Sequence, residues 1–124
     1  MHDLKLPQLK YEIESCRRLL NFIAAENVHV KNRLSEVVKD KFETTDLEEI
    51  EDYLGKFITQ DEQTSLLQRD ISIIEKRLLE KDNKDGEIGK DIYFSVRLLH
   101  SNIIKMEGLF LLLCGDFNNF LVNV

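Results

Sequence analysis

The stretch LPQLKYEIESCRRLLNFIAAENVHVKNRLSEVV, residues 6–38, decides the fold. Apolar side chains return in it in alternating steps of three and four residues, which is the spacing of one buried stripe on a coiled-coil helix. The pattern lasts for more than four heptads, and only one of its ten positions is polar. These positions are Leu6, Leu9, Ile13, Cys16, Leu20, Ile23, Asn27, Val30, Leu34 and Val37. The stretch therefore predicts one long amphipathic helix.

A second helix is predicted to follow a short connection. Thr45 and Glu48 have the spacing of a capping box, which marks a helix start. Two apolar runs follow it, Leu47, Ile50, Leu54 and Phe57, and then Leu67, Ile71, Ile74 and Leu78. The two runs do not share one heptad frame. We interpret the polar residues between them as a phase shift and not as a break, because no glycine or proline lies there.

A third helix is predicted after the polar segment at residues 81–86. Its apolar positions again step by fours and threes. They are Ile92, Val96, Leu99, Ile103, Met106, Phe110, Leu113, Phe117 and Phe120. Gly108 and Gly115 lower the helix propensity of its second half. Two alternatives stay open there, namely one continuous helix, or a kink or short fourth helix near Gly115.

Together these patterns predict an all-α fold with one domain over residues 1–124. The helices are expected over about 6–41, 46–81 and 86–122, each on the order of 50 Å long. Short connections make consecutive helices antiparallel. We therefore expect a long up-down-up three-helix antiparallel bundle with coiled-coil-like packing.

Composition and charge limit the partners and the compartment. The net charge is −6 and the pI is about 5.1, which opposes binding to nucleic acid or to an anionic membrane. The longest apolar run, residues 109–114, is too short to cross a bilayer, and the N-terminal residues lack the apolar core of a signal peptide. We expect a soluble, cytoplasmic protein. Cys16 and Cys114 are expected to be buried free thiols, roughly 28 Å apart and unable to form an intrachain disulfide.

Asn27 is the polar exception in the first stripe. Antiparallel pairing of the helices places it level with Gln60, Asp61 and Thr64. We expect these four residues to form one buried polar layer, which fixes the register of the helices and lowers their stability. The alternative interpretation is a polar pocket or an ion site at the same height.

Glu26 and His29 have the Glu-x-x-His spacing of bundle metal sites, which need both side chains inward and a second such motif. No second motif exists, and His29 lies about 200° around the helix from Asn27. We interpret the pair as surface residues and expect no cofactor. A metal-binding bundle that uses Glu26, His29, Asp61 and Glu107 is kept as an alternative. Without a phosphate loop or a nucleophile elbow, the sequence favours a protein that is not an enzyme and has no catalytic residues.

The third helix has more apolar surface than a three-helix bundle buries. Every residue from 109 to 114 is apolar, and a helix that is apolar all round needs cover on several sides. Ile104, Leu111 and Leu112 lack obvious partners in this fold, so either the C-terminal segment folds back over them or a second chain does. Gly108 and Gly115 share one face, which permits a close helix approach. We therefore predict a non-enzymatic interaction or scaffold protein that forms a homodimer through this helix. The alternative is a small acidic chaperone or adaptor that binds the amphipathic helix of another protein.

Overall fold

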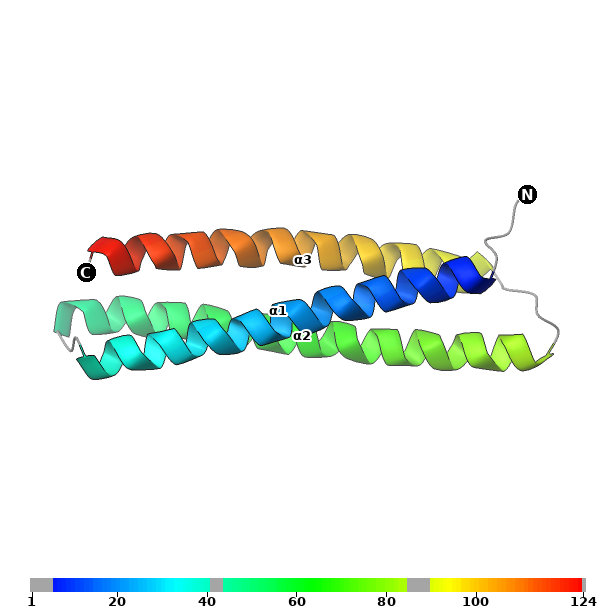
Figure 1. Cartoon of the computed structure of the whole chain (residues 1–124), viewed down its shortest axis with the longest axis horizontal. Coiled ribbons are helices and arrows are strands. Elements are labelled where there is room, and N and C mark those ends of the chain that lie inside the picture. The colour runs from blue at the N-terminus through cyan, green and yellow to red at the C-terminus, as the bar shows by residue number, and fades with distance from the viewer. Residues whose placement is uncertain (1–5, 41–43, 85–89, 124) are drawn as a thin grey trace.

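Three long helices make up the described part of the chain. The computed structural model describes residues 6–40, 44–84 and 90–123. The helices are α1 (Leu6–Asp40), α2 (Thr44–Lys84) and α3 (Lys90–Asn123). Figure 1 shows α1 and α3 running in one direction and α2 in the other, and each helix packs against both of the others. The predicted all-α, up-down-up three-helix bundle is confirmed.

The helix ends differ from the predicted ones by a few residues. α2 continues to Lys84, so most of the segment 81–86 that was predicted as a loop is helical. Neither glycine nor proline occurs between Gly55 and Gly86, and Lys81 and Lys84 suit the negative end of the helix dipole. α2 already begins at Thr44, whereas the side chain of Thr45, and with it the predicted capping box, lies outside the described residues.

α3 passes through both of its interior glycines without a break, so the alternative of a short fourth helix near Gly115 is wrong. Two turns of helix follow that glycine, and they are held on the bundle by aromatic contacts. The ring of Phe117 lies 5.3 Å from that of Tyr53 and 5.6 Å from that of Phe57, measured between centroids. Buried aromatic contacts of this kind offset the helix penalty of glycine, which is about 1 kcal/mol.

α2 has one unbroken stripe, so the predicted phase shift is wrong. Its inward positions step by three and four along the whole helix. They are Ile50, Tyr53, Phe57, Gln60, Thr64, Leu67, Ile71, Ile74 and Leu78. Tyr53 takes the inward position predicted for Leu54, which lies at the edge of the bundle and is 36% exposed. The polar residues of α2 therefore occupy the stripe itself.

The two cysteines are free, as the topology requires. Cys16 is buried in the core, and Cys114 is half-buried on α3. Burial raises the pKa of both thiols. The Glu12 carboxylate adds to the rise in the pKa of Cys16. Near Cys114, Glu26 also raises the thiol pKa and Arg33 lowers it.

Candidate functional site

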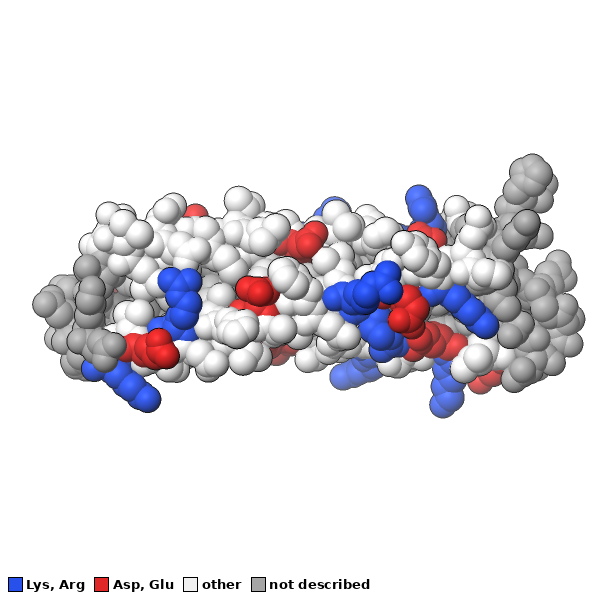
Figure 2. Space-filling model, in the orientation of Figure 1, with Lys and Arg blue, Asp and Glu red and all other residues white. Residues whose placement is uncertain are grey.

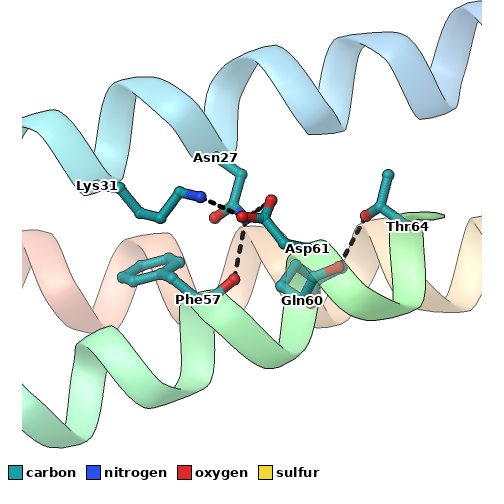
Figure 3. Close-up of polar contacts among 6 residues, drawn as sticks. All are labelled: Asn27, Lys31, Phe57, Gln60, Asp61 and Thr64. Atoms are coloured by element: carbon teal, nitrogen blue, oxygen red, sulfur yellow. Dashed lines mark hydrogen bonds and ion pairs between the residues drawn. The ribbon is translucent and has the colours of Figure 1, made fainter.

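A group of polar side chains crosses the middle of the bundle between α1 and α2 (Figure 3). Asn27, Gln60 and Thr64 are buried in stripes that are otherwise apolar. Asp61 lies beside the α2 stripe and is half-buried, where it meets Lys31 of α1. We call these five residues the polar layer.

The Asn27 side chain binds α2 at two points. Its Nδ2 donates a hydrogen bond to the backbone carbonyl of Phe57 at 3.0 Å and another to Oδ1 of Asp61. Lys31, one turn further along α1, forms an ion pair with Oδ2 of the same carboxylate. Two donors on α1 thus meet acceptors on α2, and they match in only one register. A polar group at a stripe position fixes register in this way in coiled coils.

Sequence reasoning missed Lys31. Residues four apart share one side of a helix, so its place one turn after Asn27 and opposite an acidic residue was the signal that pointed to it. On the α3 side of the layer, Thr64 contacts Met106, with Oγ1 at 3.9 Å from the sulfur.

Two buried atoms of the polar layer, Asn27 Oδ1 and Gln60 Nε2, have no hydrogen-bond partner among the described residues. The Asn27 amide cannot turn over, because its oxygen would then face the two acceptors that its nitrogen now binds. The Thr64 hydroxyl donates its one proton to the carbonyl of Gln60 at 2.9 Å, so it is not free to donate to Asn27 Oδ1. A buried unpaired polar group costs about 1–3 kcal/mol. We therefore expect the layer to specify the helix pairing at some cost in the stability of the fold.

The residues of the metal-site alternative do not converge. Asp61 is engaged by Asn27 and Lys31, His29 is exposed, and Glu26 neighbours Cys114 at α3. In residues 6–40, 44–84 and 90–123, no three His, Cys, Asp or Glu side chains gather within reach of one ion. Nor does Glu107, which is half-buried on α3, complete such a group.

α3 carries a long apolar surface on the side away from the bundle core. Leu112 is 67% exposed and Leu111 is 56% exposed. We define the α3 outer face as the exposed apolar side chains of this helix together with its two glycines: Phe94, Leu98, Ile104, Gly108, Leu109, Leu111, Leu112, Gly115 and Val122. Figure 2 shows few charged side chains over α3 and many more on the lower part of the view.

The two glycines of the outer face are not packed against any described part of the chain. A Cβ atom added at Gly108 or Gly115 would meet nothing within 4 Å. Each glycine lowers helix stability by about 1 kcal/mol relative to alanine. The close approach that they permit is used by no described part of the chain.

α3 is also a candidate membrane span by length and composition, although no membrane is present in the structure. Its most apolar stretch is 22% buried in the bundle. The core helices of soluble proteins pass the same test, and polar contacts attach the N-terminal half of α3 to its neighbours. Arg77 of α2 pairs with Asp91 at 2.6 Å, and Arg97 pairs with Glu12 of α1 at 3.4 Å. The absence of a membrane partner stays a prediction.

A groove between α2 and α3 extends this apolar surface sideways. It has a volume of about 230 Å³, and Ile73, Leu98 and Leu99 are among its lining residues. Ligand pockets for small molecules usually measure about 300–1,000 Å³. The groove is therefore the size of one or two side chains of a partner.

Comparisons with known proteins identify no relative, so the candidate function rests on the geometry described above. No family model, no curated protein and no solved structure matches the chain.

Proposed function

We propose that the protein is a non-enzymatic helical scaffold that associates with a second copy of itself through the α3 outer face. The exposure of that face is the observation that carries the proposal. Leu98, Leu111 and Leu112 remain more than half exposed while the inward stripe of the same helix is buried. Contiguous exposed apolar patches mark interaction sites. Covering one such leucine stabilises an association by about 1–2 kcal/mol.

The charge distribution along α3 supports the same proposal. Between Gly108 and the last described residue, Asn123, Asp116 is the one charged side chain. The core of a protein interface is depleted of charged residues and enriched in large apolar ones. The second half of α3 has this composition on its exposed side.

A protein partner suits α3 better than a lipid bilayer. A bilayer needs about 20 apolar residues in succession, and any stretch of that length in α3 that contains the apolar run 109–114 includes Lys105 and Glu107. Each charged residue near the bilayer centre opposes insertion by about 2.5–3.5 kcal/mol. The rim of a protein interface accepts the same charges in contact with water.

The groove beside the outer face favours a second candidate function. This second function is that of an adaptor, which binds an amphipathic helix of another protein and places the apolar side chains of that helix over Ile73 and Leu98. Helix-in-groove recognition uses anchors three and four residues apart. In this case the purified protein alone is a monomer.

Sedimentation equilibrium at micromolar concentrations tests the proposal, with two variants matched in residue type and exposure. Leu111 on α3 and Leu79 on α2 are each 56% exposed. We expect the wild type and Leu79→Glu to be dimers and Leu111→Glu to be a monomer, with the same helical circular dichroism in all three. A monomeric wild type over this range contradicts the proposal and favours the adaptor.

A further inference from the structure

Three small residues form one line along the middle of the exposed side of α3. Ser101, Gly108 and Gly115 are spaced by seven residues, and residues seven apart keep the same position on a supercoiled helix. All three are exposed. Larger side chains, Phe94 and Val122, occupy the same position at the two ends of the line. A second helix therefore comes closest to α3 at the glycines.

Two charged side chains beside this line have opposite sign and no ion pair with any described residue, namely Lys105 and Asp116. Both lie toward α2. The backbone carbonyl of Asp116 accepts a hydrogen bond from Tyr53 of α2, and Lys105 follows Asn102, which lines the α2–α3 groove, by one turn. When a two-fold axis pairs α3 with an antiparallel α3, the side that lies toward α2 in one copy meets the same side of the other copy.

The direction of pairing decides whether these charges meet. Lys105 and Asp116 are eleven residues apart, or about 16 Å along the helix axis, and a parallel in-register pair keeps that separation between copies. In an antiparallel pair with Gly108 opposite Gly115, Asp116 of the second copy lies level with residue 107. The axial separation from Lys105 is then about 3 Å, and the contact forms twice by symmetry.

We propose that the self-association is an antiparallel two-fold pairing of α3 with α3 of a second copy. In this arrangement Gly108 faces Gly115 and Lys105 pairs with Asp116, each across the two-fold axis. The inference rests on the proposed function, since it specifies the geometry of the same association. Opposite charges brought together across a symmetric interface fix its register and orientation.

A stable interface must be wider than one helix, so it includes two side chains that flank α3. The pairing runs from Ser101 to Val122, about 32 Å, and a stable complex buries about 800 Å² on each partner. The contact must then be roughly 25 Å wide, more than the 10–12 Å of one helix. Two half-exposed side chains, Leu66 and Phe22, flank this part of α3. Leu66 lies one heptad before the groove residue Ile73, and Phe22 lies one turn before Glu26.

Cysteine cross-linking tests the geometry in the full chain with Cys114 replaced by alanine. Cys16 stays, because it is buried in the core. Gly108→Cys and Gly115→Cys, carrying tags of different size, are oxidised separately and as a mixture. We expect a disulfide-linked heterodimer in the mixture and little product from either variant alone. Gly55→Cys, at an exposed glycine of α2, is the matched control and stays uncross-linked.

The other results of cross-linking overturn the geometry. Efficient self-cross-linking of both variants indicates a parallel dimer, and self-cross-linking of Gly108→Cys alone indicates an antiparallel pair in another register. A mixture of the two cysteine variants that stays dimeric without any product shows that α3 is not the contact. A monomeric wild type instead refutes the proposed function, so the two failures are distinguishable. Flotation of the wild type with uncharged phosphatidylcholine vesicles identifies a bilayer as the partner and also overturns the pairing.

A charge exchange tests the pairing of Lys105 with Asp116 directly. Lys105→Asp and Asp116→Lys each place like charges together twice, and we expect each to raise the dimer Kd about tenfold. The double variant Lys105→Asp/Asp116→Lys restores the opposite charges and the wild-type Kd. A double variant that dimerises no better than the single variants refutes the pairing.

Discussion

The polar layer buries polar side chains and the α3 outer face exposes apolar ones, which is the reverse of the usual placement. Contacts among the described residues account for the polar layer but not for the outer face. Asn27 is polar and 0% exposed, and its nitrogen meets two acceptors on α2. Leu112 is apolar and 67% exposed, and no described residue covers it. A buried polar residue with partners has a role in folding. An exposed apolar face without cover points to a contact with another molecule, and this is why we place the function on α3.

The largest expected effect separates the core under α3 from its outer face. Phe117 is buried against two aromatic rings of α2, so Phe117→Ala should lower the free energy of unfolding by about 3–5 kcal/mol. Leu112→Ala should change it by less than about 0.5 kcal/mol in dilute, monomeric protein. Urea denaturation measures both. An equal loss in the two variants would show that the outer face is covered within the monomer and would break the comparison.

A smaller effect of opposite sign is expected at the polar layer. Asn27→Leu removes a buried acceptor that no described residue binds, and Asp61 keeps its ion pair with Lys31. We expect the free energy of unfolding to rise by about 1–2 kcal/mol. The exposed residue Asn32 on the same helix provides the control, because Asn32→Leu should have little effect. If Asn27→Leu destabilises the protein, the hydrogen bonds of the layer outweigh its desolvation.

The glycines of α3 should respond with opposite signs in the monomer and in the dimer. Gly108→Ala meets no atom within 4 Å in the monomer, so it should stabilise the monomer by about 1 kcal/mol. The added methyl group should weaken dimerisation, because it separates the two helices. Gly55→Ala on α2 meets no atom either and should raise the Tm without changing dimerisation. Unchanged association in Gly108→Ala would argue against a close approach at this residue.

The smallest expected effect is a loss of stability in alkali. Burial raises the pKa of Cys16 and Cys114 above 9.0, the ordinary value that applies to the unfolded chain. Their contribution to stability is therefore complete below pH 9.0 and is lost as the pH rises through the folded pKa. The Tm, measured from about pH 8 to pH 10.5, should fall less steeply in Cys16→Ala than in the wild type. A slope that does not change on removal of either thiol would contradict this assignment.

The stripes of α1 and α3, and from them the topology, were predictable because long hydrophobic periodicity reports the buried side of a helix. The stripe of α2 was misread for a physical reason. Its inward positions include Tyr53, Gln60 and Thr64, and a pattern built on aliphatic residues passes over them. The continuity of α3 depends on the contacts of Phe117 with α2, and such tertiary contacts override local glycine propensity.

The candidate sites were predictable to different degrees. The levels estimated from antiparallel pairing placed Asn27 beside the α2 residues that it meets. Lys31 was missed because its side chain lies at the flank of the α1 stripe and not in it. Three-helix geometry predicted that Leu111 and Leu112 lack partners, and both are exposed. No described residue covers them, so a covering molecule and its identity stay a prediction.

The parallel course of α1 and α3 makes the bundle a spacer of fixed length. The chain enters the described bundle at Leu6 and leaves it at Asn123, at opposite ends of a rod about 50 Å long. Groups joined to the two ends are therefore held one rod length apart. In the proposed antiparallel pair, with Gly108 opposite Gly115, the two rods are staggered, so the start of one copy lies about 15 Å beyond the finish of the other at each end. The paired rods thus have two equivalent ends, and the distance between them is set by the number of helical turns and by this stagger.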